Sequence, residues 1–293
     1  MITCIGEILA DVIMDKKTGQ MNAYVGGAPF NVAVSCAQNG TKTRFIGRVG
    51  TDSIGEFLSG ELERCNYIDI VLQKDKIRNT TVAFVSLDEN NERDFTFFRN
   101  NTADYHINFS EKDVENMNPE KDILHVGSLM ISEECGRKLA NQIFDTAKKN
   151  NIRISFDVNY REDLFGRGER AFLYLSPYIQ KADIVKFSSD EIELYLGKPW
   201  NEAIKELNNG IVCVTLGKDG CVIKRGTEIL KVETEAVIPV DTTGAGDAFF
   251  GVFIGSLSEI GYDNAVGEKL FEIAQKANKA GAKATLHKGA IEL

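Results

Sequence analysis

The most informative stretch of the chain is Val240-Asp-Thr-Thr-Gly-Ala-Gly-Asp-Ala-Phe-Phe-Gly-Val-Phe-Ile-Gly255. A turn rich in threonine and glycine runs directly into a helix, predicted over residues 245–260, that has almost no polar face. We expect this helix to be buried, so that its N-terminus forms a dry, electropositive pocket. Three backbone N–H groups at this end have at most a methyl group in front of them and are predicted to close around an anion such as a phosphate. They belong to Gly244, Ala245 and Gly246.

Asp247 lies in the first turn of the same predicted helix. A carboxylate at this place commonly does no more than complement the helix dipole. Beside a phosphate, however, it would be repelled unless it had a chemical task. The natural task is to take a proton from the hydroxyl that attacks a phosphoryl group. The segment therefore predicts in-line phosphoryl transfer, with Asp247 as general base and the three amides stabilising the charge of the transferred group.

A second glycine cluster surrounds Gly26 and Gly27, and Pro29 suits the first turn of a following helix. By pattern alone this is as often a plain strand–turn–helix junction as a binding site. The functional interpretation is a surface for a polyhydroxylated ligand. The backbone N–H groups of the two glycines and the side-chain amide of Asn31 can donate hydrogen bonds to hydroxyls, and Asp11 can accept them.

Two weaker segments also end predicted strands. A threonine and two glycines follow the strand predicted at 211–215, where open α/β sheets bind nucleotides, although a plain hairpin would look the same. They are Thr215, Gly217 and Gly220. A carboxylate, an amide and a guanidinium at alternate positions end the strand predicted at 153–157 and are expected to face one cleft. They are Asp157, Asn159 and Arg161.

Short β-rich segments alternate with amphipathic helical patterns along most of the chain. Strands are predicted at 2–9, 44–49, 122–126, 153–157, 183–187 and 211–215. Helices are predicted at 53–65, 133–150, 170–181 with an interruption near Pro177, 190–196, 245–260 and 265–283. This alternation is typical of βαβ units, so we expect an α/β fold with a mostly parallel central sheet flanked by helices.

One region breaks the alternation. Residues 80–87 and 94–98 flank the polar turn at 88–93 and predict a β-hairpin. Together with residues 10–25 this hairpin could form a small separate sheet, or it could be an antiparallel edge of the main sheet. The pattern favours neither alternative. We therefore expect one large α/β domain over residues 1–293 with a small β appendage.

Composition excludes several classes of function. The chain has 293 residues and a formal charge of −9, with its charges scattered, so neither nucleic acid nor a membrane is expected as a partner. The six cysteines contain no CxxC pair and only three histidines are present, which argues against a zinc site or a disulfide framework. No apolar run approaches the length of a membrane span. We expect reduced thiols and a cytoplasmic protein, in which an anionic ligand needs a local site.

These motifs resemble the PfkB, or ribokinase-like, family of carbohydrate kinases. Residues 240–251 are similar to the C-terminal signature of the family, and Gly26-Gly27-x-x-x-Asn31 is similar to the N-terminal one. The similarity extends over essentially the whole chain. The resemblance implies a ribokinase-like fold and ATP-dependent phosphorylation of a sugar hydroxyl, with Asp247 as catalytic base beside an anion hole. The anion hole would consist of Gly244, Ala245 and Gly246.

The resemblance also implies the ligand contacts. The residues that would hold the sugar are Asp11, Gly26, Gly27 and Asn31. The residues that would bind ATP are Asn159, Ser188, Thr215, Gly217, Gly220 and Asn278. Asn278 lies in a segment similar to the one that closes over adenine. In this family the β appendage is a lid over the sugar and often a dimer interface, so we expect a lid formed by about 11–25 and 79–100 and a homodimer through it.

Local sequence is most similar to fructokinases. This similarity covers the glycine pair with Pro29, residues 97–104 and residues 156–161, and it implies Arg99 and Arg161 as further sugar contacts. The expected reaction converts D-fructose to fructose 6-phosphate. Kinases of aminoimidazole riboside and 2-keto-3-deoxygluconate share much of this local sequence and remain alternatives. A kinase of ribose also remains an alternative, although ribokinases carry a different sequence at the glycine pair, as does a catalytically silent sugar sensor. A nicotinamide-dependent dehydrogenase is disfavoured because no GxGxxG follows the first strand.

Two departures from the family pattern concern ATP and metal binding. The Asn-x-x-Glu motif appears as Ser188-Ser-Asp-Glu191, so Glu191, which is linked indirectly to Mg²⁺, is kept while the asparagine is replaced. The chain also stops at residues 291–293 without the extension common in relatives. Mg²⁺ is expected to accompany ATP. A monovalent cation such as K⁺ would bind beside the anion hole, at Asp241 and Thr243.

Overall fold

Two β-sheets organise the chain. The computed structural model describes residues 1–14, 18–87, 93–167, 169–291 and 293. The strands are β1 Ile2–Ile5, β2 Leu9–Met14, β3 Met21–Gly26, β4 Thr43–Gly50, β5 Asp69–Asp75, β6 Val82–Leu87, β7 Arg93–Phe98, β8 Ile123–Gly127, β9 Arg153–Asp157, β10 Ile184–Ser188, β11 Ile211–Thr215, β12 Cys221–Arg225 and β13 Glu228–Val232. They form a nine-stranded sheet of order β13-β12-β11-β10-β9-β8-β1-β4-β5 and a four-stranded sheet of order β3-β2-β6-β7.

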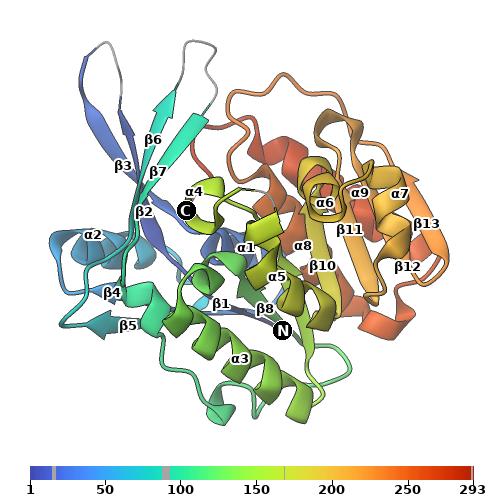
Figure 1. Ribbon diagram of the computed structural model, residues 1–293, viewed down its shortest axis with the longest axis horizontal. Helices are drawn as coiled ribbons and strands as arrows, with labels where there is room; N and C mark the ends of the chain where they lie inside the picture. The colour runs from blue at the N-terminus through green and yellow to red at the C-terminus, as the bar shows by residue number, and fades with distance from the viewer. Residues whose placement is uncertain (15–17, 88–92, 168, 292) are drawn as a thin grey trace.

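Helices cover both faces of the nine-stranded sheet (Figure 1). The α-helices are α1 Ala28–Gln38, α2 Ser53–Leu62, α3 Glu134–Lys149, α4 Glu162–Phe165, α5 Glu169–Lys181, α6 Ser189–Leu196, α7 Trp200–Glu206, α8 Ala245–Ile260 and α9 Glu268–Ala284. The 3-10 helices are η1 Ala103–His106, η2 Glu111–Asp113, η3 Ser128–Ser132, η4 Gly217–Asp219 and η5 Tyr262–Asn264. One apolar core joins α1, α2, α8 and α9 to the sheet, and a second joins α3, α5, α6 and α7 to its other face.

The strand pairing confirms the predicted architecture. Every pair from β5 across to β11 is parallel, and only β12 and β13 add antiparallel strands among the described residues of this sheet. Parallel strands joined by helices require both faces of the sheet to be covered, which explains why the central strands are almost entirely buried while the edge strand β5 is not. Within the described ranges, no helix is both long and apolar enough to cross a membrane.

The prediction of one strand over residues 2–9 was wrong. The chain leaves the nine-stranded sheet after β1, passes through residues 6–8, and enters the four-stranded sheet as β2. Ile8 is as buried as the strand residues, so the apolar pattern resumes directly after the crossing and hides the break, although Gly6 and Glu7 interrupt it. The crossing is tight, since a Cβ atom at Gly6 would lie 2.5 Å from Cγ of Pro29.

The predicted interruption of the helix at 170–181 was also wrong. Helix α5 runs from Glu169 to Lys181 with Pro177 inside it. A proline in a helix has no N–H group, so the carbonyl four residues earlier loses its usual hydrogen-bond donor. That residue is Leu173, whose side chain is 67% exposed, so its carbonyl lies on the solvent side of the helix where water can satisfy it.

The predicted hairpin is confirmed, and it belongs to a separate sheet. Strands β6 and β7 pair antiparallel, β6 pairs parallel with β2, and β2 pairs antiparallel with β3. Figure 1 shows this four-stranded sheet projecting from the body of the molecule at the upper left. Most of the predicted turn at 88–93, and residues 15–17 of the expected lid, lie outside the described residues.

Helices α1 and α8 pack unusually closely, and Gly251 permits it. A Cβ atom at Gly251 would lie 2.6 Å from Cβ of Ser35 and 2.7 Å from the carbonyl oxygen of Val32, both on α1. The Cys36 thiol donates a hydrogen bond of 3.1 Å to the Gly251 carbonyl. Because the backbones touch, the N-termini of the two helices are held side by side at one edge of the sheet.

Replacing Gly251 with alanine should force α1 and α8 apart. We expect G251A to lose about 1–3 kcal/mol of unfolding free energy, the usual range for overpacking, as measured by urea denaturation. Gly60 is the matched control, because it also lies within a helix and no described atom is within 4 Å of its Cβ position. G60A should gain about 0.5–1 kcal/mol from helix propensity. Equal unfolding free energies for the two variants would contradict the close-contact interpretation.

Candidate active site

The candidate site lies where the carboxyl ends of the parallel strands meet. Residues that follow or end β1, β8, β9, β10 and β11 all reach this edge, because parallel strands point the same way. The N-termini of α1 and α8 arrive at the same edge through the contact at Gly251. The structure therefore brings both glycine clusters of the sequence to one place.

Asp247 is joined to Asn31 across the two helix N-termini. The side-chain amide of Asn31 donates a hydrogen bond of 2.8 Å to Oδ2 of Asp247. Burial raises the pKa of the Asp247 carboxyl, against the opposing effects of the Asn31 hydrogen bond and of the charges on Lys186 and Arg161. A carboxylate with a raised pKa is a stronger base, and one of its oxygens is held in a fixed direction.

A buried ion pair lies directly beneath the N-terminus of α8. Nζ of Lys186 is 2.9 Å and 3.0 Å from the two carboxylate oxygens of Asp157, and these side chains are only 7% and 2% exposed. Burial alone would lower the pKa of Lys186, but the carboxylates of Asp157, Glu191 and Asp247 raise it. The lysine is therefore held as a cation. A Cβ atom at Gly246 would lie 3.0 Å from this ammonium, so positive charge faces the predicted anion cradle.

The cradle itself begins at Gly244, which caps α8. Gly244 has φ 76° and any Cβ there would collide with the carbonyl of Ala290 in the C-terminal tail, so only glycine fits. The N–H of Ala245 donates a long hydrogen bond of 3.3 Å to Thr242. Asp241 accepts hydrogen bonds from the backbone N–H groups of Thr243 at 3.0 Å and Gly289 at 2.7 Å, which ties the tail to the loop before α8.

Glu191 and Ser188 form a capping box at the start of α6. The Glu191 carboxylate accepts from the backbone N–H of Ser188 at 2.7 Å, and the Ser188 hydroxyl accepts from the backbone N–H of Glu191 at 3.2 Å. The other oxygen of Glu191 accepts from the N–H of Tyr160 at 2.8 Å. Serine is a strong N-cap with glutamate at the third helical position, which explains how it can stand where the family motif has asparagine.

The predicted sugar-binding residues lie at the junction of the two sheets. Asp11 lies on β2 beside β3, and a Cβ atom at Gly26 would overlap its carboxylate. Gly27 is the N-cap of α1 and its carbonyl accepts the N–H of Asn31 at 2.9 Å. The Asp11 carboxylate therefore lies against the glycine backbone at Gly26, which is the arrangement expected for a site that binds sugar hydroxyls.

The predicted nucleotide-binding residues divide into two sets. Thr215 ends β11, and Gly217 and Gly220 bracket the turn into β12, all at the carboxyl edge next to β10. Asn159 follows β9 at the same edge with φ 35°.

Asn278 differs from the expectation: it is buried on α9 and its amide donates to the carbonyls of Val232 and Glu233. It therefore joins α9 to the end of β13, and this amide has no donor left for a nucleotide.

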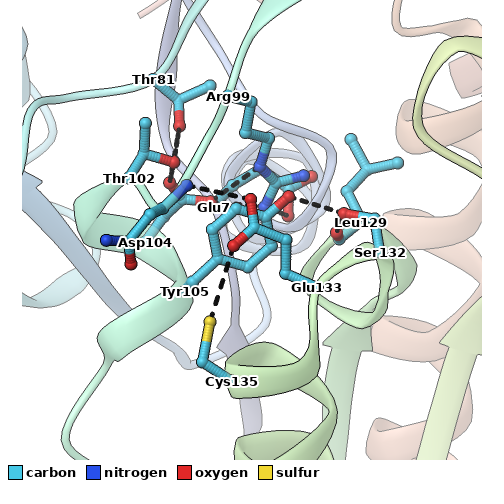
Figure 2. Close-up of polar contacts among 11 residues, drawn as sticks. Glu7, Thr81, Arg99, Thr102, Asp104, Tyr105, Leu129, Ser132, Glu133 and Cys135 are labelled. Carbon is cyan, nitrogen blue, oxygen red and sulfur yellow. Dashed lines mark hydrogen bonds and ion pairs between the residues drawn. The ribbon is translucent and has the colours of Figure 1, made fainter.

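Arg99 lies in a buried group that sequence reasoning identified only in part (Figure 2). Its guanidinium forms an ion pair with Asp104 and lies 3.9 Å from the Glu7 carboxylate, and its Cζ is 4.5 Å from the centre of the Tyr105 ring. Asp104, Glu7 and Lys186 were missed. A signal existed for two of them: Glu7 and Lys186 interrupt otherwise apolar segments, and a buried charge needs a partner.

Comparison with known proteins identifies the family of the chain. The model of the pfkB family carbohydrate kinases matches residues 1–293. The chain belongs to this family. It is therefore a sugar kinase with the ribokinase-like α/β fold that the motifs predicted.

Relatives of the chain are similar over nearly their full length. A probable fructokinase of Arabidopsis thaliana is 34% identical, with 99% of this chain and 92% of the relative covered. An ATP-dependent 6-phosphofructokinase of Thermoanaerobacterium thermosaccharolyticum is 32% identical, with coverage of 87% and 81%. The crystal structure of a Vibrio cholerae fructokinase bound to fructose, ADP and calcium ion superposes with a TM-score of 0.87 at 31% identity, covering 99% of this chain and 94% of that one.

The ion pair beneath α8 can be tested by a double-mutant cycle. Lys186→Met leaves the Asp157 carboxylate buried without its cation and should cost about 3–5 kcal/mol of unfolding free energy. The double variant K186M/D157N removes both charges and should recover most of that loss, as measured by urea denaturation. If the losses of unfolding free energy in K186M and D157N instead add up to the loss in the double variant, the two residues are not coupled as described.

Proposed function

We propose that this sugar kinase transfers the γ-phosphoryl group of ATP to D-fructose and forms fructose 6-phosphate, with Asp247 as general base. The observation that carries the proposal is the position of the Asp247 carboxylate at the N-terminus of α8, fixed by Asn31 and placed near the Lys186 ammonium. The choice of fructose rests on the fructokinases among the relatives and on the local sequence similarity.

The proposed reaction is an in-line displacement. The sugar hydroxyl oxygen bonds to the γ-phosphorus while its proton passes to the Asp247 carboxylate, and the bond from that phosphorus to the ADP oxygen breaks. The backbone N–H groups of residues 244–246, the dipole of α8 and the Lys186 charge stabilise the transferred group. Burial raises the pKa of Asp247, which increases its basicity as the hydroxyl proton leaves.

ATP and Mg²⁺ would occupy the edge between β9 and β11. The proposed ATP contacts are Asn159, Ser188, Thr215, Gly217 and Gly220. Both carboxylate oxygens of Glu191 accept backbone N–H groups, from Tyr160 and Ser188, so Glu191 would act on Mg²⁺ indirectly, through water. Within the described ranges no three His, Cys, Asp or Glu side chains are grouped to hold a metal, so the ATP phosphates would provide most of its ligands. When bound, the ion would neutralise phosphate charge.

A K⁺ site beside the anion hole is part of the same proposal. Asp241 is buried and holds both the loop before α8 and the C-terminal tail, so a cation at Asp241 and Thr243 would stiffen the cradle. The hard oxygens of a carboxylate and of backbone carbonyls suit such an ion.

The sugar would lie between the two sheets. The proposed contacts are Asp11, Gly26, Gly27, Asn31, Arg99 and Arg161. The four-stranded sheet, with residues of 11–25 and 79–100, would then act as a lid over it. It carries exposed apolar side chains, including Phe98 at 61% and Met21 at 56%, which supports a homodimer formed through this sheet.

The dimer is tested by placing a charge on this sheet. Phe98→Asp should shift the protein from dimer to monomer in sedimentation velocity, because burying an unpaired carboxylate opposes association. Ile229→Asp is the control, since Ile229 is 41% exposed on β13, at the far edge of the other sheet. A wild-type protein that sediments as a monomer, or equal effects of the two substitutions, would contradict the proposed interface.

The proposed base is tested by Asp247→Asn. We expect turnover of fructose, measured as ADP release, to fall by about 10²–10⁴-fold while ATP binding is kept. Asp190→Asn is the matched control, because Asp190 also lies in the first turn of a helix, α6, but is exposed. D190N should turn over fructose normally. Near-normal turnover by D247N would refute the assignment of the base.

The substrate is tested by a sugar panel. Fructose, ribose, aminoimidazole riboside and 2-keto-3-deoxygluconate cover the alternatives, and fructose 6-phosphate belongs in the panel because one relative is named a 6-phosphofructokinase. The proposal expects the highest kcat/KM with fructose. A strong preference for another sugar would overturn the substrate and leave the kinase activity standing.

A further inference from the structure

Arg99 is enclosed by two carboxylates in the wall between the two sheets (Figure 2). Its Nε donates to Oδ2 of Asp104 at 3.0 Å, its second terminal nitrogen also pairs with that oxygen, and Glu7 lies 3.9 Å away. The side chains of Arg99 and Glu7 are 0% exposed and that of Asp104 is 1% exposed. Three segments thus contribute one charge each: the crossing after β1, the end of β7, and η1.

The Asp104 carboxylate is also held by hydrogen bonds at its second oxygen. The hydroxyls of Thr81 and Thr102 lie 2.6 Å and 2.7 Å from its other oxygen, Oδ1. Burial raises the pKa of Glu7, while the nearby Arg99 opposes this. With Glu7 ionised the three groups carry a net charge of −1, and with Glu7 protonated they carry none. The guanidinium therefore presents no net positive charge in either state.

Several polar atoms of this group lack a partner. Both oxygens of Glu7, the remaining nitrogen Nη1 of Arg99 and Oδ1 of Asn31 are buried without a hydrogen-bond partner among the described residues. Buried polar atoms of this kind call for a ligand or water. They lie next to the proposed sugar site, because Cβ at Gly27 would be 2.5 Å from the Glu7 carbonyl and the charge of Glu7 raises the pKa of Asp247.

The other cations of the site are balanced in the same way. Lys186 is paired with Asp157, and Arg161 is close enough to Asp247 to lower its pKa. The site thus offers directed donors and acceptors without an excess of positive charge. Hydroxyl groups can use such donors and acceptors, whereas a ligand carboxylate needs an uncompensated cation.

We propose that Glu7 and Asp104 are specificity-determining residues that cancel the charge of Arg99 and so restrict the sugar site to neutral sugars, excluding sugar acids. This inference rests on the proposed function, because it assumes that the sugar binds between the two sheets. Glu7 and Asp104 act through Arg99 and are positioning residues.

The test compares D-fructose with 2-keto-D-gluconate, which differs only in carrying a carboxylate in place of the C1 hydroxymethyl group and keeps the C6 hydroxyl. Binding is measured by calorimetry and turnover by ADP release, for the wild type, E7Q, D104N and the double variant E7Q/D104N. The wild type should favour fructose. The preference for the acid relative to fructose should rise in D104N, which removes the carboxylate paired with Arg99, and by about tenfold or more in the double variant, where Arg99 is uncompensated. E7Q alone changes the charge only where Glu7 is ionised, so it reports the protonation state of Glu7.

Both substitutions keep side-chain size, and thermal unfolding establishes that each variant is folded. Ser132→Ala is the matched control: it removes the hydroxyl 2.6 Å from the Tyr105 hydroxyl in the same region without changing any charge, so the ratio should stay at the wild-type value. An unchanged ratio in the folded double variant E7Q/D104N overturns the inference.

Wild-type protein that prefers 2-keto-D-gluconate also overturns the inference, while leaving sugar kinase activity intact. Conversely, wild-type protein that binds fructose over the acid but releases no ADP would refute the proposed reaction and support the charge inference. The two failures are therefore distinguishable.

Discussion

The hydrogen bond between Asn31 and Asp247 is the interaction on which the site depends. It joins the first turns of α1 and α8, two helices more than two hundred residues apart in the sequence. It can form because Gly251 lets the helix backbones touch, so neither N-terminus can move without the other. One N-terminus brings the proposed sugar contacts and the other brings the base and the anion cradle. Helix packing in the core thus sets the geometry of the proposed chemistry.

Buried charge at the sheet edge is the second constraint. An isolated buried charge is expensive, and the described site pairs each buried cation with a carboxylate: Lys186 with Asp157, and Arg99 with Asp104. These pairs do not add much stability compared with apolar residues. They instead hold polar groups in fixed directions in a water-poor environment, where electrostatic stabilisation of a transferring phosphoryl group is strongest. The acidic chain can therefore handle an anionic ligand through backbone N–H groups, a helix dipole and one buried lysine.

Much of the fold and part of the site could be predicted from the sequence. Helix α8 begins and ends at the predicted residues because an apolar run bounded by glycines leaves little choice. The two glycine clusters were correctly identified as features of one family. The crossing at residues 6–8 was missed because the apolar pattern resumes at Ile8, although Gly6 and Glu7 interrupt it. Lys186 interrupts an apolar strand and so gave a signal, but its partner Asp157 lies on a neighbouring strand that only the folded chain brings beside it. Asp104 is only five residues from Arg99 in the sequence, but the pairing of the two side chains is a property of the folded chain. The hydrogen bonds of the Asn278 amide to carbonyls of another element could not be foreseen either, and its role in ATP binding stays a prediction.

In the proposed mechanism the attacking hydroxyl meets Asp247 at the N-terminus of α8. A crystal structure with D-fructose and a non-hydrolysable ATP analogue tests this most directly. We expect the C6 hydroxyl within about 3.2 Å of an Asp247 carboxylate oxygen, with the γ-phosphate facing the N–H groups of residues 244–246. A sugar bound with no hydroxyl near Asp247, or a phosphate bound away from the N-terminus of α8, would contradict it.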